Sequence, residues 1–270
     1  MKTKLPVISI PHGGGPWPLM KDAFGDSAPF DRLENHLKEL GNQLKDRIKA
    51  LLVISAHWEE AAPKVHFGQN PGMLYDYGGF PEEAYEINWP APGSPDTATR
   101  VWDLLTQSGF SPQREENRGY DHGTFIPLML AFPEADIPAA QLSLVRGLSP
   151  KTHFNMGKAL EPLREEGVLI IASGMSYHNM RGFGSRDPQV LETSQIFDSW
   201  LEKTVSCSNK EEREQRILDW EKAPGALECH PRSEHLVPLF VAAGAAGSDE
   251  GKVVFRDILM GTMISGHVFG

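Results

Sequence analysis

The sequence has few of the features that mark disulfide scaffolds or membrane proteins. It contains two cysteines, Cys207 and Cys229, which form neither a C-x-x-C pair nor a zinc-ribbon spacing. A chain of 270 residues can bury a large core without a cross-link, so we expect reduced thiols. No apolar run approaches the roughly 20 residues of a membrane span, and the run at 5–10 is too short for a signal peptide. These absences predict a cytoplasmic protein with no membrane partner.

Positive charge is also scarce. The chain has 26 lysines and arginines against 36 aspartates and glutamates, which gives a formal net charge of -10. An acidic surface repels phosphate backbones, so nucleic acid is excluded as an expected partner. The hydrophobic share of 40% is that of an ordinary globular protein, so we expect a folded chain.

Signature motifs of several enzyme classes are missing. There is no G-x-x-x-x-G-K-[ST] phosphate loop and no H-E-x-x-H zinc-protease motif. The H-G-G-G run at 12–15 is similar to an esterase oxyanion loop, but that chemistry requires a G-x-S-x-G nucleophile elbow. The nearest candidate, at 174–178, ends in histidine. We therefore interpret the three glycines as a sharp turn beside His12.

Short apolar runs alternate with longer helical patterns. Strands are predicted at 5–10, 51–55, 139–145, 168–172 and 253–259, and helices at 30–48, 125–132, 153–166 and 233–246. The last of these helices is expected to be interrupted, or to start, near Pro238. Strand followed by helix, repeated, indicates an α/β fold with a central mixed, largely parallel sheet flanked by helices. We expect one catalytic domain over residues 1–270.

The segment 70–95 is rich in glycine, proline and aromatic residues. Its aromatic side chains need burial, so we predict an ordered loop rather than a linker; they are Tyr75, Tyr77, Phe80, Tyr85 and Trp89. Long ordered loops often cover a functional site.

Histidines stand at the ends of predicted strands. His12 and His57 directly follow the first two strands, and His178 follows the strand at 168–172 within a short loop. Ligand sites of open α/β sheets form outside the carboxyl ends of the strands, so these side chains can converge. Any one of them could be structural, but three such placements together favour a site. Convergent neutral imidazoles suit a first-row divalent metal, with zinc and ferrous iron both plausible.

His122 precedes the predicted helix at 125–132. A helix N-terminus disfavours an imidazolium, which suits a hydrogen-bonding group or a proton shuttle. The alternative is a plain capping loop with Asp121 or Thr124 as the cap.

Glu234 and His235 are a further pair of candidates. They are adjacent, so only one of them is expected to point at a given site. Glu234 could instead be an acid in the first turn of the helix at 233–246, with Ser233 near the N-cap. We expect the remaining histidines to be structural or exposed, with His230 kept in reserve because it is close to His235; they are His36, His66, His153, His230 and His267.

Motifs spread over nearly the whole chain carry a resemblance. They are an H-G-x-P-like turn at 12–16 with one additional residue, S-A-H-W at 55–58, Y-D-x-x-G-F-P at 75–81, P-A-P-G-S-P at 90–95, D-H-G-x-x-x-P-L at 121–128, S-G-x-x-x-H-N at 173–179 and E-H-x-x-P-L at 234–239. In this order they resemble the class III extradiol ring-cleavage dioxygenases, in the DOPA-dioxygenase-like branch. The longer turn at 12–16 and the loosely similar tail at 265–270 depart from the family pattern and bear on the substrate.

The resemblance implies a ligand set and a cofactor. His12, His57 and His235 would bind one divalent metal ion, Fe(II) or Zn(II). In other branches the third ligand is a glutamate, so Glu234 remains a rival to His235.

The resemblance also implies an activity. A small phenolic or catechol substrate and O2 would react to give a ring-opened semialdehyde. His178 would act as acid/base or as an additional ligand, and His122 would hydrogen-bond substrate or oxygen. A zinc-dependent hydrolase on the same site and a non-catalytic metal-binding interaction protein are the alternatives. A monomer is the default expectation.

Overall fold

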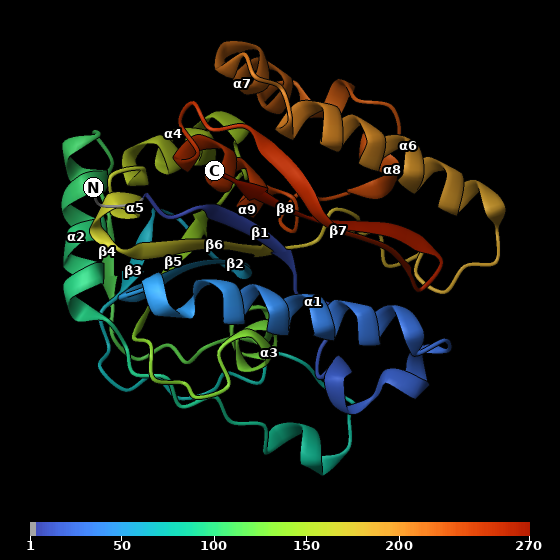
Figure 1. The fold of residues 1–270 in the computed structure, drawn as a ribbon, viewed down its shortest axis with the longest axis horizontal. Helices are drawn as coiled ribbons and strands as arrows, with labels where there is room; N and C mark the ends of the chain where they lie inside the picture. Colours follow the sequence, from blue (N-terminus) through green and yellow to red (C-terminus); the bar gives the residue numbers. More distant parts are fainter. Residues whose placement is uncertain (1–3) are drawn as a thin grey trace.

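The computed structural model describes residues 4–270, which contain one mixed sheet (Figure 1). In the described chain the sheet has eight strands in the order β4-β3-β5-β2-β6-β1-β8-β7. The strands are β1 (Val7–Pro11), β2 (Ala50–Glu60), β3 (Lys64–His66), β4 (Gln113–Glu115), β5 (Ala139–Val145), β6 (Val168–Gly174), β7 (Gly251–Leu259) and β8 (Thr262–Phe269).

The middle of the sheet is parallel. β1 and β2 both pair in parallel with β6, and β2 also pairs in parallel with β5. These strands are apolar runs with almost no alternation, as parallel strands covered on both faces require. The antiparallel hairpin β7–β8 joins β1 at one side, and β3 pairs antiparallel with β5 at the other. The carboxyl ends of β1, β2 and β6 therefore meet at one edge of the sheet.

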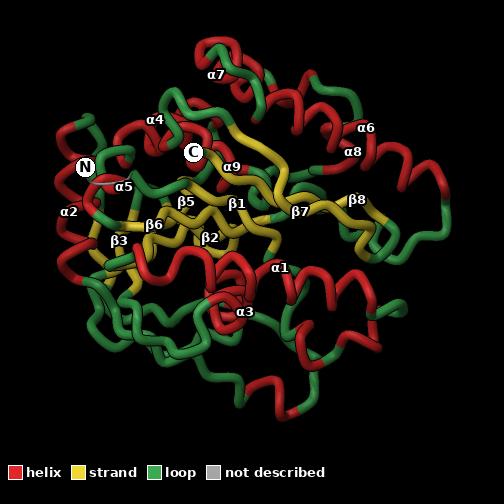
Figure 2. Tube along the Cα trace, in the orientation of Figure 1, coloured by secondary structure: helices red, strands yellow, loops and turns green. Residues whose placement is uncertain are grey.

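Helices form a layer on each face of the sheet, as the tube in Figure 2 shows. α1 (Ala28–Leu44) and α3 (His122–Ala131) pack together on one face. The other helices are α2 (Pro95–Gln107), α4 (Pro150–Leu160), α5 (Leu163–Glu166), α6 (Pro188–Val205), α7 (Lys210–Leu218), α8 (Ala226–Cys229) and α9 (Val237–Ala245). Of these, α4, α6 and α9 form the layer on the opposite face (Figure 1).

α9 is the central helix of that second layer. Every one of its residues is buried, because it lies between the sheet and α4. A Cβ atom on Gly157 would lie 2.1 Å from the Val241 carbonyl oxygen, and one on Gly244 would lie 2.1 Å from that of Phe154. The two glycines thus permit direct backbone contact between α4 and α9. This contact packs α9, the helix that follows the turn of His235, directly against α4.

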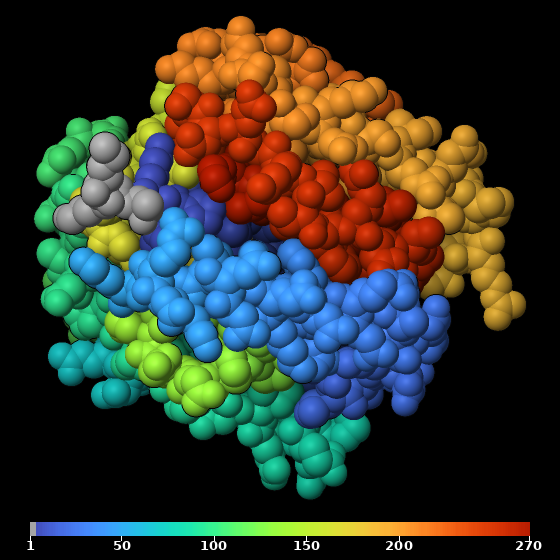
Figure 3. Space-filling model, in the orientation of Figure 1, coloured from blue at the N-terminus to red at the C-terminus, as the bar shows by residue number. Residues whose placement is uncertain are grey.

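The hairpin β7–β8 also contacts α1. In Figure 3 the surface of α1 (blue) lies against the hairpin (red). Arg32 of α1 is paired there with Asp257 of β7. The N-terminal and C-terminal parts of the chain are thereby joined on one face.

The α/β fold with a mixed, largely parallel sheet is confirmed, and several boundaries differ from prediction. The helix predicted at 153–166 is two helices, α4 and α5, because Pro162 cannot continue α4. The helix predicted within 233–246 begins at Val237, so the predicted start near Pro238 is confirmed and Ser233 is not its N-cap. β3, β4 and β8 were not predicted. Cys207 and Cys229 are free thiols, as expected.

No helix within residues 4–270 combines the length and the apolar character needed to cross a bilayer.

Candidate metal centre and active site

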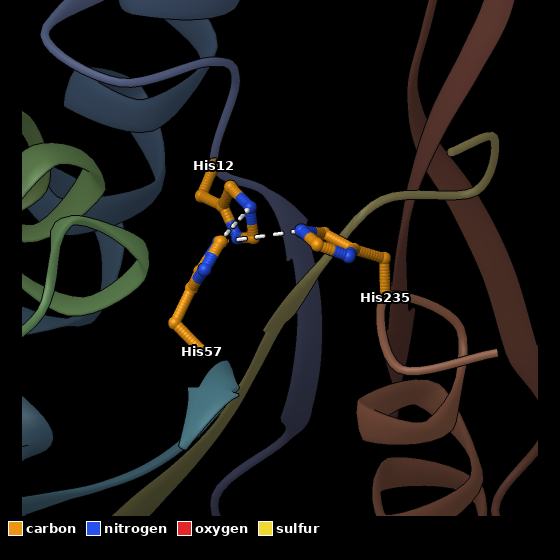
Figure 4. Close-up of side chains that lie close together, drawn as sticks. All are labelled: His12, His57 and His235. Carbon is orange, nitrogen blue, oxygen red and sulfur yellow. Dashed lines mark hydrogen bonds between the residues drawn. The ribbon is translucent and has the colours of Figure 1, made fainter. Parts of the chain in front are cut away.

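Three histidines from different segments converge at the carboxyl edge of the sheet (Figure 4). His12 directly follows β1, His57 lies in β2, and His235 lies in the turn before α9. The Nε2 atom of His57 is 3.2 Å from that of His12 and 3.2 Å from that of His235. Their potential ligand atoms all lie within 4.8 Å of one another.

The predicted position of His57 after its strand is wrong in one respect. β2 continues to Glu60, and its pairing register with β5 shifts between Ile54 and Glu59. Such irregularities re-aim side chains near functional sites. His57 thus reaches the site from within β2, where the strand departs from regular pairing.

The protons of these histidines can be assigned from their partners. Ser173 donates its single hydroxyl proton to the carbonyl oxygen of Gly123. Its Oγ lies 3.1 Å from His12 Nδ1 and must therefore accept the proton on that nitrogen. His12 Nε2 is left with a free lone pair directed at the other two histidines.

The same assignment holds for the other two rings. His235 Nδ1 lies 2.9 Å from Glu234 Oε1, and His57 Nδ1 lies 3.5 Å from Asp76 Oδ2. The Glu234 carboxylate accepts the Nδ1 proton of His235, and the Asp76 carboxylate favours a proton on the Nδ1 that faces it, so both Nε2 atoms are assigned lone pairs. Carboxylate–histidine pairs of this kind orient metal ligands. Three lone pairs that face one point can bind a cation.

The spacing of these nitrogens fits a metal ion. Nitrogen ligands about 2.0–2.1 Å from one ion are separated by about 3.2 Å when the angle at the ion is about 100°. The observed separation of 3.2 Å matches this value. His12, His57 and His235 can therefore hold one divalent ion.

Burial keeps these imidazoles neutral. Desolvation lowers the pKa of His12 and of His235 well below 6.5, with smaller contributions from neighbouring histidines. It lowers the pKa of His57 to about 4. Neutral imidazole is the form that binds metal, so the site is ready to bind an ion at pH 7.

Glu234 lies behind this cluster and contacts two histidines. Its Oε1 is 2.9 Å from His235 Nδ1 and 3.2 Å from His178 Nδ1, and its Oε2 is 3.2 Å from Arg232 Nη1. Burial alone would raise the pKa of Glu234, but the hydrogen bonds to His178 and His235 outweigh it and the pKa is lowered. The interpretation of Glu234 as an acid in the first turn of a helix is wrong, because α9 begins at Val237.

His178 lies beside the three histidines in the loop after β6. Its ring stacks on that of His235, with centroids 3.3 Å apart and an interplanar angle of 16°. Its Nδ1 proton is directed at Glu234, which leaves Nε2 free as a base. The side chain is 21% exposed, so a small molecule can reach it.

His122 is the first residue of α3, and Asp121 is the N-cap. The Asp121 carboxylate accepts a hydrogen bond from the Thr124 amide at 3.1 Å. Of the two expected cap residues, Asp121 and Thr124, Asp121 is therefore the one that caps the helix. His122 Nδ1 lies 2.8 Å from Asp76 Oδ1, and its ring centroid is 4.0 Å from that of His57. His122 therefore lines the same site.

Asp76 is a site residue that the sequence analysis missed. It accepts from the amide and the imidazole of His122 and also faces His57. Burial alone would raise the pKa of Asp76, but the hydrogen bond to His122 lowers it. Its position in the Y-D-x-x-G-F-P motif at 75–81 was the available signal.

The aromatic loop covers the site as expected. Tyr77 packs edge-on against His122 with ring centroids 5.8 Å apart, and its hydroxyl donates to the Ala84 carbonyl at 2.5 Å. Trp89 is buried and donates to the Phe132 carbonyl at 2.9 Å. The only regular element of the loop before α2 is a 3-10 turn at Glu82–Tyr85.

The remaining histidines belong to no described cluster of candidate ligands. His153 accepts from the Val145 amide at 2.9 Å and donates to the Ser149 carbonyl at 2.8 Å. His230 donates to the Ser176 carbonyl at 3.0 Å. These bonds account for two of the buried rings as structural groups.

Comparison with known proteins agrees with this geometry. Residues 9–267 match the family described as the catalytic LigB subunit of aromatic ring-opening dioxygenase. The chain is similar to a 4,5-DOPA dioxygenase extradiol of Beta vulgaris, with 42% identity over 89% of this chain and 86% of that protein. It is also similar to dioxygenase tasH of Hapsidospora irregularis, with 36% identity over 98% of this chain and 85% of that protein.

A solved structure has a similar fold. It is the crystal structure of uncharacterized protein JW3007 from Escherichia coli K12, with a TM-score of 0.77 and 25% identity. The similarity covers 98% of this chain and 99% of that one. On the family match and these relatives, the chain belongs to the LigB family of aromatic ring-opening dioxygenases, the class III extradiol enzymes.

Proposed function

We propose that this protein is a metal-dependent extradiol dioxygenase. It inserts both atoms of O2 into a catechol-type ring and yields a ring-opened semialdehyde. The observation that carries this proposal is the convergence of three histidine Nε2 atoms at one point, beside an accessible histidine–carboxylate pair. Family membership supports the reaction class.

The proposed ligands are His12, His57 and His235, and the proposed ion is Fe(II). The chemistry that ferrous iron supplies when bound is redox exchange between catechol and dioxygen, which zinc cannot perform. Glu234 is assigned to the orientation of His235 rather than to the metal, because both its hydrogen-bonded contacts are with Nδ1 atoms.

His178 is proposed as the acid/base. Its free Nε2 can accept a phenolic proton, and the Glu234 carboxylate on Nδ1 stabilises the imidazolium that forms. Arg232 pairs with Glu234 and with Glu59, which holds the carboxylate in place. The proton is available for return to the ring-opened product.

His122 is proposed to bind the substrate. Asp76 takes its Nδ1 proton, so Nε2 can accept a hydrogen bond from a substrate hydroxyl. Asp76 also faces His57 and therefore joins the metal site to this substrate contact. The pairs His178–Glu234 and His122–Asp76 include two histidines that are not proposed as metal ligands. A purely structural metal site would not need them, so they favour an enzyme.

Oxygen uptake tests the proposal. The protein is reconstituted anaerobically with Fe(II) or with Zn(II) and then mixed with aerated catechols, DOPA among them. We expect uptake and a yellow ring-opened product in the iron sample alone. No uptake with any catechol at full iron occupancy would contradict the proposal.

A further inference from the structure

An apolar pocket opens beside the histidine cluster. Its volume is about 230 Å³, and it is lined by glycines 13–15, four phenylalanines, three methionines, one leucine and His178. We infer that the substrate is a catechol with an apolar substituent, which occupies this pocket while the ring hydroxyls face the histidines. The inference rests on the proposed ring cleavage and specifies its substrate class.

The pocket is continuous with the site through two of its walls. His178, in one wall, stacks on His235 at 3.3 Å, and glycines 13–15, in another, directly follow His12. When the two hydroxyls of a catechol ring face these histidines, a substituent on the opposite side of the ring points away from them. That substituent would lie in the pocket.

The volume suits a substituent of several carbon atoms. An apolar cavity of about 150 Å³ accommodates a benzene molecule, so 230 Å³ has room beyond a single ring. Phenylalanine side chains give the pocket rigid apolar walls, and methionines adapt to irregular shapes.

Apart from His178, whose Nδ1 already faces Glu234, the lining carries no acidic or basic side chain. Lys21, near one wall, is already paired with Asp31 and Glu34. Arg181 lines a separate cavity that also contains Glu228. A carboxylate or ammonium group in the apolar pocket would lose hydration without gaining a partner. The pocket therefore disfavours the amino-acid substituent of DOPA.

Gly14 is the position in the turn at which pocket size can be changed. Gly13 and Gly15 have φ values of +74° and +51°, and a Cβ atom on them would approach Trp17 or Phe80. A Cβ atom on Gly14 meets no atom within 4 Å, and its backbone is outside the left-handed region. A larger residue at Gly14 would thus narrow the pocket without straining the turn.

Met180 lies at the rim of the pocket. It is 71% exposed although it is one of the lining residues. An exposed apolar side chain at this point extends the apolar wall to the entrance. Because Met180 is exposed to solvent, a charged residue can replace it without being buried.

Binding to the zinc-loaded protein tests the inference without turnover. Calorimetric titration compares catechol, 4-propylcatechol and dihydrocaffeate, whose side chain has the length of propyl but ends in a carboxylate. Each buried carbon strengthens binding about fourfold, so 4-propylcatechol should bind on the order of 50-fold more tightly than catechol. We expect dihydrocaffeate to bind at least about tenfold more weakly than 4-propylcatechol.

Substitutions in the lining test whether the preference for 4-propylcatechol arises in this pocket. Gly14→Leu should remove most of the advantage of 4-propylcatechol over catechol. Gly72→Leu is the matched control, because Gly72 also has open space around its Cβ position but lines none of the described pockets. Met180→Arg provides an independent test and should strengthen dihydrocaffeate binding several-fold.

Three results would overturn the inference: equal affinity for dihydrocaffeate and 4-propylcatechol, unchanged 4-propylcatechol affinity in a folded Gly14→Leu variant, or unchanged dihydrocaffeate affinity in Met180→Arg. Oxygen uptake by the iron-loaded protein is measured separately. Selective binding of 4-propylcatechol without uptake would contradict ring cleavage and support the pocket assignment. Uptake with equal kcat/KM for both compounds would support cleavage and overturn the substrate class.

Discussion

At the scale of single residues, the site depends on where a few protons lie. Ser173 and Glu234 accept the Nδ1 protons of His12 and His235, Asp76 faces Nδ1 of His57, and this leaves the three Nε2 atoms free. The sequence singled out His12, His57 and His178 because each lies at or just after the end of a predicted strand, and the family motif added His235. It did not identify Ser173 or Asp76, because hydrogen-bond partners far apart in sequence meet only in the folded chain.

His178 separates acid/base function from metal binding. We predict that His178→Ala lowers kcat by roughly 10²–10⁴-fold, the usual contribution of a general acid–base group, while most metal remains bound. The measurements are oxygen uptake and metal analysis of the purified variant. Near-normal oxygen consumption would refute the assignment.

His57 has the opposite expected behaviour. His57→Ala removes one of the three converging nitrogens, so the purified variant should lose most of its metal. Metal analysis by mass spectrometry after dialysis measures the loss. Full occupancy in this variant would show that His57 is not a ligand.

Glu234 is predicted to orient two histidines by its charge. Glu234→Gln should weaken metal binding about 10–100-fold, the usual effect of losing such a partner of a ligand. Competition with a chelator measures the affinity. The control is Glu228→Gln, at an exposed glutamate nearby. An unchanged metal affinity in Glu234→Gln would contradict the orienting role.

At the scale of elements, the contact between α4 and α9 supports the helix that begins just after His235. Gly157→Ala would put a Cβ atom 2.1 Å from the Val241 carbonyl oxygen and push α9 away from α4. We predict a loss of about 1–3 kcal/mol in the free energy of unfolding, together with lower metal occupancy. Urea unfolding measures the first, and Gly72→Ala, with open space around it, is the control. Unchanged stability and occupancy in Gly157→Ala would refute this role of the helix contact.

Some strands and helices could be predicted from the local sequence, and others could not. The continuous apolar runs of β1, β2, β5 and β6 predicted the parallel centre of the sheet. β3 and β4 have three residues each, too few for a periodic pattern. The sequence left the start of α9 open between Ser233 and Pro238, because the turn before it is shaped by contacts of Glu234 and His235 rather than by a capping residue.

At the scale of the whole molecule, buried neutral histidines make stability depend on pH. Burial lowers the pKa of His153 and of His267 from 6.5 to about 4. The folded protein therefore binds fewer protons than the unfolded chain, and the stabilisation is complete above pH 6.5. It is lost as the pH falls from 6.5 through 4, by on the order of 3 kcal/mol for each group.

Urea unfolding at a series of pH values tests this dependence. The free energy of unfolding should fall between pH 6.5 and pH 4. His153→Gln should show a shallower decline, because glutamine does not titrate. A flat profile for the natural chain would contradict the prediction.

The central claim is that O2 enters an aromatic ring at this histidine cluster. The most direct test supplies the iron-loaded protein with a catechol and heavy-isotope dioxygen in ordinary water, and follows the product by mass spectrometry. The account predicts a ring-opened product with heavy oxygen in its new carboxylate, and no such product from the zinc-loaded protein. A product whose new oxygen comes only from water would contradict it.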